Sequence, residues 1–406
     1  RPVFLMSRVI PIAPAPAAEV GNLEFRVSPP LALYIHVPWC VRKCPYCDFN
    51  SHELRGEIPE AAYLAALVAD VEAALPLVWG RPVVSLFFGG GTPSLLSPAG
   101  VERLLADLRM RLPIQPDAEI TLEANPGTVE TGRFAEFREA GINRVSLGIQ
   151  SFDDEALRVL GRIHGAAEAR VAAEVAARHF ATFNLDLMYG LPGQEVAGAV
   201  ADLEFALGFA PPHLSCYQLT LEPNTRFAAQ PPAGLPDGDT CADMEEAIES
   251  RLVGAGYVHY ETSAYAQPRH PCRHNLNYWQ FGDYLGIGAG AHSKLTLHDR
   301  VLRQMRWKHP DAYLAHVASG TPIQEESTVA ASALPFEFLM NALRLADGFP
   351  LALFESRTAT RVAALLPRLR AAADEGLLTL SADRVVPTPR GRRYLNILLE
   401  RFLDLG

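Results

Sequence analysis

Three cysteines of this chain of 406 residues lie within one short segment. Cys40, Cys44 and Cys47 have the spacing C-x3-C-x2-C, and Asp48 and Phe49 follow without starting a second pair. Structural zinc usually takes four nitrogen or sulfur ligands in paired motifs, and no second pair lies near in the sequence. Three thiolates can instead hold an iron-sulfur cubane that leaves one iron open for a small molecule. The spacing favours a 4Fe-4S cluster, with zinc or three structural cysteines as alternatives.

A glycine-rich run offers contacts for a molecule on that open iron, which can bind the amino and carboxylate groups of S-adenosylmethionine (SAM). The run FFGGGTPS extends from Phe87 to Ser94, directly after a predicted strand. Glycine allows backbone N–H groups to approach a ligand closely, although a strained strand-to-helix turn would explain the same run. We expect a cradle for the methionine part of SAM here.

Polar side chains at the ends of later predicted strands extend this candidate site. Glu123 and Asp186 are acidic residues in apolar strands, where a buried carboxylate is costly unless it has a partner. A salt bridge to a helix or a bound ligand would supply that partner. Gln150 and Arg162 lie near the same edge, and Arg162 suits either a carboxylate or a surface position.

The elements that must position these residues alternate between β-rich runs and helical patterns, which is typical of a parallel sheet. We predict strands near residues 31–37, 83–88, 119–124, 144–149, 183–189 and 213–219. We predict helices near residues 60–78, 97–111, 129–140, 153–161, 166–179 and 195–209. Because these units fall short of a closed eight-unit barrel, the sequence predicts an α/β fold with a partial, open (β/α)6 barrel. Ligands would gather at the carboxyl ends of its strands.

Outside this predicted core the composition changes. Residues 1–30 are rich in Pro and Ala and predict a disordered tail, which leaves 31–260 as the core. Residues 261–406 predict a mostly helical C-terminal domain, and residues 257–296 predict an irregular stretch rich in Tyr and His. The chain ends with the outline of a winged helix, two helices followed by a two-stranded ribbon and a last helix. These helices are expected near residues 335–346, 360–375 and 390–403.

Charge and hydropathy limit the partners of the chain. A net charge of -10 and a pI near 5.7 argue against broad electrostatic capture of nucleic acid or of an anionic membrane. No apolar run approaches the roughly 20 residues of a membrane span, and no secretory signal is recognised. With clustered cysteines that suit a reducing compartment, the sequence predicts a cytoplasmic protein. DNA binding by the winged helix is the least favoured function, despite Arg390, Arg392, Arg393 and Arg401.

The chain resembles the oxygen-independent coproporphyrinogen III oxidase family of radical SAM proteins in several segments taken together. These segments are YIHVPWCVRKCPYCDFN, FFGGGTPS, LEANPG, SLGIQSFDDEALRVLGR and DLMYGLPGQ. The resemblance runs from about Tyr34 to the C-terminus, and it implies that Cys40, Cys44 and Cys47 ligate the cluster. It also implies contacts with SAM for Tyr34, Tyr46, Gly90, Gly91, Thr92, Glu123, Gln150, Arg162 and Asp186.

Two features make the chain more similar to the haem chaperone branch of that family than to the oxidases. The oxidase pattern continues C-x-C after the third ligand, whereas Phe49 stands at that position here. The segment HNLNYW matches the H-N-x-x-Y-W signature of the branch. In it, His274 offers an imidazole for haem iron, and Tyr278 and Trp279 offer flat faces for a porphyrin. A loop cap with aromatic packing would explain the same residues, and Cys272 is an alternative soft ligand.

The resemblance thus implies a haem chaperone that binds haem, a 4Fe-4S cluster and SAM and transfers haem to an acceptor such as a respiratory enzyme. A dimer and peripheral contact with a membrane acceptor are compatible with this role. The competing function is decarboxylation of coproporphyrinogen III propionates by radical SAM chemistry. Phe49 weighs against that activity but leaves SAM cleavage open, because three ligands suffice for it. His36 and His292 flank the expected chamber, and no catalytic residue is predicted.

Overall fold

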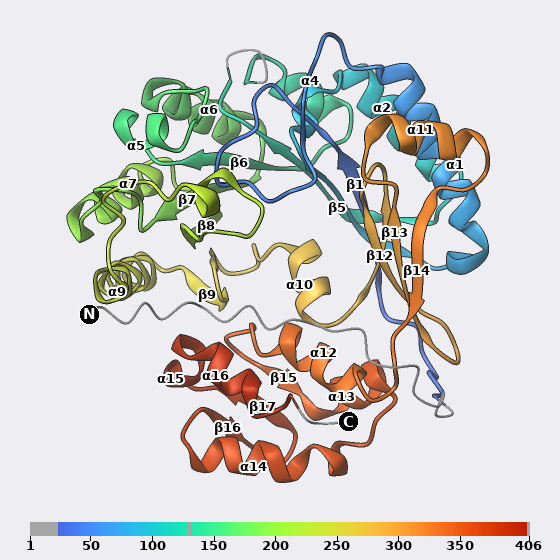
Figure 1. Cartoon of the computed structure of the whole chain (residues 1–406), viewed down its shortest axis with the longest axis vertical. Coiled ribbons are helices and arrows are strands. Elements are labelled where there is room, and N and C mark those ends of the chain that lie inside the picture. The colour runs from blue at the N-terminus through green and yellow to red at the C-terminus, as the bar shows by residue number, and fades with distance from the viewer. Residues whose placement is uncertain (1–22, 128–130, 404–406) are drawn as a thin grey trace.

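The computed structural model describes residues 23–127 and 131–403, and most of its strands form one sheet (Figure 1). This twelve-stranded sheet has the order β14-β13-β12-β11-β1-β4-β5-β6-β7-β8-β10-β9. Its central strands, from β1 to β8 in this order, all pair in parallel. They are β1 (Leu31–Val37), β4 (Val83–Gly90), β5 (Ile114–Ala124), β6 (Arg144–Gln150), β7 (Thr182–Tyr189) and β8 (His213–Gln218).

Helices connect these parallel strands and lie along the outer side of the curved sheet (Figure 1). They are α1 (Glu60–Val78), α2 (Pro98–Arg109), α4 (Phe134–Glu139), α5 (Asp154–Val159), α6 (Ala166–His179) and α7 (Val196–Leu207). Side chains cap two of them, since Ser97 accepts from the Gly100 N–H and Asp153 accepts from the Ala156 N–H. The sheet stays open, with β9 and β14 at its edges. The predicted partial (β/α)6 barrel is therefore confirmed.

Further strands, most of them antiparallel, extend the sheet beyond these central strands at both ends. One end adds β10 (Ala264–Ala266) and β9 (Val258–Glu261), which follow α8 (Arg226–Ala229) and α9 (Gly238–Gly254). The other end adds β11, which pairs in parallel with β1, and three strands that continue antiparallel. These elements are α10 (Arg273–Trp279), β11 (Asp283–Ile287), β12 (His292–Thr296), β13 (Val301–Arg306), α11 (Pro310–Ala318) and β14 (Ile323–Thr328).

The expectation of an irregular stretch at residues 257–296 is wrong, because β9, β10, α10, β11 and β12 occupy much of it. These elements are short, from three to seven residues, and their windows are too small to show a clear period. β10 and β11 form because β8 and β1, which are distant in the sequence, offer free edges to pair with, and β9 and β12 then pair with β10 and β11.

The C-terminal unit contains the two helices and the two-stranded ribbon that the sequence predicts, together with one further strand and one further helix (Leu351–Thr358) before the ribbon. Two short helices replace the single last helix that was expected. The sheet of this unit has the order β15-β17-β16, in which β15 was not foreseen. The elements are α12 (Leu334–Ala342), β15 (Phe349–Pro350), α13 (Leu351–Thr358), α14 (Leu366–Asp374), β16 (Leu378–Leu380), β17 (Arg384–Pro387), α15 (Pro389–Arg393) and α16 (Leu395–Glu400). In Figure 1 this unit, in orange and red, lies below the large sheet.

Two hydrophobic cores underlie these two units. The larger core lies under the sheet and includes Leu285 and Leu302, so β11 and β13 belong with the sheet although they follow residue 260. The smaller core fills the C-terminal unit, where Phe338 packs edge-on against Phe349. Phe25 is also buried there, so the described part of the expected tail packs against the fold, whereas residues 1–22 lie outside the described residues.

Helix α1 is long and apolar enough to cross a membrane by length and composition alone, which differs from the sequence-based expectation. Its apolar side chains pack in the larger core, where Tyr63 and Leu67 are fully buried. Asp70, in the middle of the helix, is also buried and accepts hydrogen bonds from Arg306 at 3.1 Å and from the Tyr313 hydroxyl at 3.0 Å. Packing against the sheet accounts for the apolar composition of α1.

Candidate functional site

The three clustered cysteines lie in the loop after β1, at the carboxyl edge of the sheet. Two short strands, β2 (Trp39–Cys40) and β3 (His52–Glu53), pair in parallel and close this loop. The Cys47 N–H donates to the Cys44 carbonyl at 3.2 Å, and all three cysteines are half-buried and outside any disulfide of the described residues. Within the described ranges, no three His, Cys, Asp or Glu side chains gather around one point as ligands of a single metal ion.

One cleft at this edge brings the cysteines together with most of the predicted SAM contacts. Because parallel strands end at the same edge of a sheet, segments far apart in the sequence meet there. The cleft is lined by Cys40, Cys44, Cys47, Tyr46, Gly90, Gly91, Thr92, Glu123, Gln150, Arg162 and Asp186. Tyr34 is the predicted contact that lies outside this cleft, since it lines an adjoining cavity.

Arg162 ties the cysteine loop to the sheet. Its guanidinium donates to the Cys44 sulfur at 3.6 Å, to the Asn125 side-chain oxygen at 2.5 Å and to the Gly148 carbonyl at 2.8 Å. Its Nε is buried and has no partner among the residues that the structure describes, and Asn125 in turn donates to the Thr92 hydroxyl at 3.0 Å. Hydrogen bonds to ligand sulfurs tune iron-sulfur clusters, so an arginine at Cys44 fits a cluster at this loop.

Two carboxylates face the cleft without an ion-pair partner among residues 23–127 and 131–403. Glu123 accepts from the Gly90 N–H at 3.2 Å, and Asp186 accepts from the Ser146 hydroxyl at 3.1 Å and from the Asn184 amide at 2.8 Å. Burial and the charge of Asp186 raise the pKa of Glu123 to about 8, and burial raises the pKa of Asp186 as well. A cationic ligand would stabilise the ionised carboxylates and so offset the cost of burying their charge. The amine and the sulfonium of SAM are such cations.

The glycine run at the end of β4 is required by close packing. A Cβ on Gly90, which has a φ of +111°, would lie 2.5 Å from the His36 ring, and a Cβ on Gly91 would lie 2.5 Å from the Trp39 carbonyl. The expected cradle of N–H groups is not free, because the N–H groups of Gly91 and Thr92 donate to Val37 and Trp39 and that of Gly90 donates to Glu123. Contacts of this run with SAM would therefore use its carbonyl oxygens or side-chain hydroxyls such as that of Thr92.

Gln150 ends β6 in a left-handed conformation, with a φ of +69°. This conformation is uncommon outside glycine and asparagine, and such strain gathers at ligand sites. The pairing of β6 with β7 shifts register just before it, between Leu147 and Gln150. The amide of Gln150 turns toward the cleft, where its nitrogen would lie 3.0 Å from a Cβ on Gly148.

A second cavity, of about 580 Å³, adjoins the cleft between β1, α10 and β12. Its walls are largely aromatic and contain the predicted residues Tyr34 and His274. The volume lies in the range of about 300–1,000 Å³ that is usual for cofactor sites. The lining residues are Tyr34, His36, Phe49, Asn50, Phe87, Gly90, Glu123, His274, Asn275, Tyr278, Trp279, Tyr284, Gly290 and His292. We call it the aromatic cavity.

His274 enters this aromatic cavity from the first turn of α10. Glu119 accepts the N–H groups of Arg273 and His274, both at 3.1 Å, and so caps the helix. The His274 ring stacks on Phe87 with centroids 4.8 Å apart, and its Nδ1 lies 3.2 Å from the Ser85 hydroxyl. No hydrogen-bond partner of its Nε2 is found in the described part of the chain. Burial, with a smaller effect of the Arg144 charge, lowers the pKa of His274 to about 3, which keeps the imidazole neutral.

The other candidates of this region have separate roles. Cys272 is fully buried outside the cavity lining and donates to Glu119 at 3.4 Å. His36 has both ring nitrogens occupied, with the Tyr34 hydroxyl at 3.1 Å and the Asn50 carbonyl at 2.8 Å. His292 lines the cavity from β12. Among the described histidine ring nitrogens of the aromatic cavity, Nε2 of His274 is thus the one that has no hydrogen-bond partner and also belongs to the HNLNYW segment.

Tyr278 and Trp279 differ in how much of each ring is free. Tyr278 stacks on Tyr284 with centroids 4.3 Å apart. The Arg344 guanidinium lies 4.3 Å from the centroid of the Trp279 ring, and the Trp279 Nε1 is buried with no hydrogen-bond partner in the described ranges. One face of Trp279 is therefore used to hold the C-terminal unit, to which Arg344 belongs.

Sequence reasoning missed several residues of the cleft. Asn125, Ser146 and Gly148 line it, and Asn125 bonds to both Arg162 and Thr92. Asn125 was detectable, because it lies two residues after Glu123 and alternate residues of a strand share one face. Ser146 carries no such signal, since serine is common at every kind of position.

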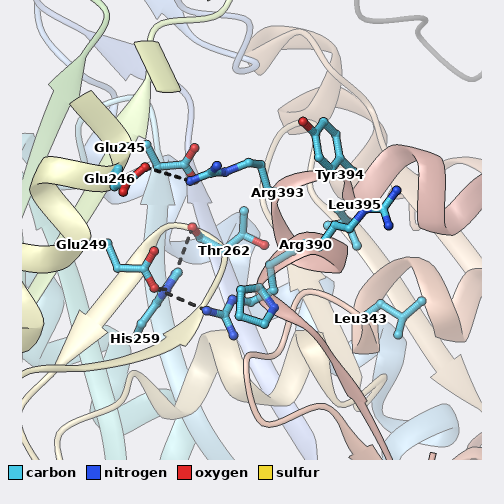
Figure 2. Close-up of a pocket in the computed structure, with 12 residues that line it drawn as sticks. Glu245, Glu246, Glu249, His259, Thr262, Leu343, Arg390, Arg393, Tyr394 and Leu395 are labelled. Atoms are coloured by element: carbon cyan, nitrogen blue, oxygen red, sulfur yellow. Dashed lines mark hydrogen bonds and ion pairs between the residues drawn. The ribbon is translucent and has the colours of Figure 1, made fainter. Parts of the chain in front are cut away.

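A third feature is a cavity between α9 and α15, where the large sheet unit meets the C-terminal unit (Figure 2). Arg392 pairs with Glu249 at 3.4 Å, and Arg393 pairs with Glu246 at 3.2 Å. Acidic side chains thus face two of the arginines that had suggested DNA. The cavity is a charged joint between the units, and none of the predicted cofactor residues lines it.

Comparisons with known proteins agree with this architecture. Residues 34–206 match the model of the radical SAM superfamily, and residues 330–394 match the HemN C-terminal domain. The fold is similar to that of coproporphyrinogen III oxidase (HemN) from Escherichia coli, a radical SAM enzyme, with a TM-score of 0.79 and 25% identity. That alignment covers 93% of this chain and 91% of the other. Fold and site thus define a radical SAM protein, and membership of this superfamily implies a 4Fe-4S cluster and SAM.

Curated relatives narrow the class further. Heme chaperone HemW of Escherichia coli is 50% identical, over 92% of this chain and 98% of that protein. Its namesake in Haemophilus influenzae is 48% identical over the same shares, and that of Mycobacterium tuberculosis H37Rv is 37% identical over 95% and 98%. The chain belongs to the HemW family of radical SAM proteins.

Proposed function

We propose that this protein is a haem chaperone, which binds haem in the aromatic cavity and transfers it to an acceptor protein. The unpartnered Nε2 of His274, inside an aromatic cavity and within the HNLNYW segment, is the observation that carries the proposal. Full-length relatives that bear the name heme chaperone HemW support the same function.

The environment of His274 suits an iron ligand. When its Nδ1 carries the proton and donates to Ser85, the lone pair of Nε2 is left free, which is the arrangement that orients most metal-binding histidines. Because burial lowers its pKa to about 3, the ring does not have to lose a proton before it binds iron at neutral pH. Stacking on Phe87 holds the ring plane in place.

We assign the cluster and SAM to the neighbouring cleft. Cys40, Cys44 and Cys47 are the proposed cluster ligands, and the predicted contacts that share their cleft are proposed to bind SAM. Glu123 would meet a cationic group of SAM, while Arg162 and Asn125 hold the cysteine loop at the strand ends. When bound, the cluster and SAM supply one-electron chemistry at the sulfonium.

The oxidase alternative lacks support at one position. Phe49, which replaces the second cysteine of the C-x-C pattern, lines the cleft with an exposed apolar ring. The relatives that align over nearly the whole chain with 37–50% identity are named as heme chaperones, whereas the oxidase HemN is 25% identical. We therefore do not assign propionate decarboxylation to this protein.

The remaining parts of the proposal concern partners. We propose a haem-containing respiratory protein as the acceptor, met in the cytoplasm or at the inner face of a membrane. A dimer is compatible with this transfer. Nucleic acid is not a proposed partner, because the chain carries a net charge of -10 and two arginines of its winged-helix end face glutamates.

An anaerobic comparison tests the proposal. Reconstituted protein receives a reductant, SAM and coproporphyrinogen III in one arm, and is titrated with haem in the other. We expect stoichiometric haem binding without porphyrin turnover, and His274→Ala should weaken binding by about tenfold or more, as expected for loss of a metal ligand. His298→Ala, an exposed histidine with 88% of its side chain accessible, serves as the control. Catalytic formation of protoporphyrinogen would refute the chaperone function. Unchanged haem binding by His274→Ala would show that His274 is not part of the haem site.

A further inference from the structure

Phe49 stands where three cavities meet. It lines the cleft of the cluster cysteines, the aromatic cavity, and a third cavity lined by Asp186 of β7 and Tyr217 of β8. Its ring is large and apolar, yet 61% of the residue is exposed. Single exposed apolar residues are common on protein surfaces, but this ring borders three cavities, so a ligand that entered them could cover its apolar surface and gain free energy.

The backbone around Phe49 is firmly held. Its carbonyl accepts from the Lys43 ammonium at 3.1 Å and from the Ser51 N–H at 2.7 Å. The next residue, Asn50, donates to the carbonyls of Ala289 at 3.0 Å and Lys308 at 2.9 Å. These bonds hold the backbone that carries the ring in place before any ligand arrives, so the segment itself needs no ordering on binding.

The ring itself has no aromatic partner among the described residues, although other rings of the same cavity pair with one another. Phe87 stacks on His274, and Tyr278 stacks on Tyr284. Phe87 also lines the same third cavity as Phe49, so the two rings border one continuous space. A flat aromatic ligand that entered this space would find Phe49 as a free face.

We propose that Phe49 stacks on the porphyrin ring of bound haem, which makes the cysteine loop one wall of the haem site. This inference rests on the proposed haem function and adds to it a residue that acts on the macrocycle. His274 acts on the iron, whereas Phe49 acts on the ring, so the two contributions are separable. The residue that distinguishes this loop from the C-x-C pattern thereby gains a role in recognition of the ligand.

Titrations of the full-length protein with haem and with metal-free protoporphyrin separate the two roles. Phe49→Ala should weaken both ligands by about tenfold, which corresponds to about 1.4 kcal/mol, and Phe49→Tyr should restore both. His274→Ala should weaken haem and leave the metal-free porphyrin unchanged, because that ligand has no iron. Val41→Ala is the matched control, since Val41 is a 48% exposed apolar residue of the same loop and lines none of these three cavities.

The outcomes distinguish failure of this inference from failure of the proposed function. If Phe49→Ala binds both ligands like the wild type while His274→Ala loses haem, stacking on Phe49 is refuted and the chaperone proposal stands. If Val41→Ala weakens binding as much as Phe49→Ala, the effect comes from the loop as a whole and the inference also fails. If the wild type binds neither ligand, both proposals fail together.

Discussion

The cysteine cleft and the aromatic cavity share a wall, yet they are built in different ways. The cleft collects polar groups from the ends of β4, β5, β6 and β7, and these strands follow one another in the sheet. The aromatic cavity joins β1 to α10 and β12, which lie more than half the chain away in sequence. The first is a product of the repeating βα pattern, while the second depends on contacts between distant segments, among them the pairing of β1 with β11 and the capping of α10 by Glu119.

This difference suggests that a substitution can impair ligand binding at one site without impairing it at the other. Gly90, Glu123 and Phe49 line both, whereas the cysteines belong to the cleft and His274 to the aromatic cavity. Variants of residues that are not shared should therefore affect one ligand and spare the other.

The largest effect is expected from the cluster ligands. Cys44→Ser should abolish the cluster, because serine is a poor ligand for this softer site and the open cubane has no spare protein ligand. Anaerobic reconstitution followed by iron and sulfide analysis and visible absorption measures the loss. Cys241→Ser, at a buried cysteine of α9, is the control and should keep the full cluster. Haem titration of Cys44→Ser should match the wild type, and a parallel loss of haem affinity would contradict separate sites.

A smaller effect is expected at the arginine that holds the cysteine loop. Arg162→Lys keeps the charge but cannot reproduce the three hydrogen bonds to Cys44, Asn125 and Gly148. We expect SAM to bind about 10–100-fold more weakly, the usual range for loss of residues that support a metal site. Equilibrium dialysis with labelled SAM measures this. Arg158→Lys, on the exposed face of α5, should bind SAM normally, and equal losses in both variants would argue against this role.

Affinity for SAM should also depend on pH through Glu123. Its pKa of about 8 in the ligand-free protein is far above the ordinary value of 4.5, so the carboxyl is largely protonated at neutral pH. A cation beside it favours the ionised form, so binding must release a proton below pH 8. Affinity should therefore rise with pH by at most about tenfold per unit and level off above about pH 8. Glu123→Gln should bind more weakly, with a flat profile, and an unchanged slope in this variant would assign the proton to another group.

The same carboxyl has a consequence for stability. The folded state holds its proton up to about pH 8, while an unfolded chain loses it near 4.5. Between these values the folded state binds more protons, so the contribution of Glu123 to the free energy of unfolding falls as pH rises and is constant above about pH 8. Denaturant unfolding of ligand-free protein should show Glu123→Gln gaining stability relative to wild type from about pH 6 to pH 8.

The smallest effect is expected at the charged joint of Figure 2. The charged groups of Arg393 and Glu246 lie 3.2 Å apart, but 51% of the Arg393 side chain and 72% of the Glu246 side chain are exposed. Exposed ion pairs of this kind contribute about 0.2–1 kcal/mol, so Arg393→Ala should lower the free energy of unfolding only slightly and less at high salt. Chemical denaturation at two salt concentrations measures this change. Arg401→Ala is the control, because Arg401 and its partner Glu375 both lie in the C-terminal unit. A large change in haem affinity would show that the joint communicates with the aromatic cavity.

Much of the fold was predictable, because each βα unit carries its own local pattern. Helix α1 has the bounds that the sequence predicts, and the six parallel strands lie where β-rich runs indicate them. The cleft was predictable for the same reason, since Glu123 and Gln150 end neighbouring strands. The spacing of the cysteines indicates a 4Fe-4S cluster without any knowledge of three-dimensional contacts.

The aromatic cavity was not predictable to the same degree. His274 stands out as part of a signature, but Glu119, which caps its helix, lies in a strand far away in sequence. The N–H groups of the glycine run were also misjudged, because their partners Val37 and Trp39 belong to another segment. Local patterns show which residue types are present, whereas hydrogen-bond partners depend on how distant segments meet.

The pairing of β1 with β11 has a consequence for synthesis of the protein. One edge of β1 stays unpaired until Asp283 and the residues after it have left the ribosome. Until then the nascent chain exposes the edge of a nearly continuous apolar strand, the kind of surface that aggregates or recruits a chaperone. The cysteine loop is anchored through Asn50 to residues 289 and 308, so it too becomes fixed late. Insertion of iron and sulfide into this loop is therefore expected to follow synthesis of residues 289–308.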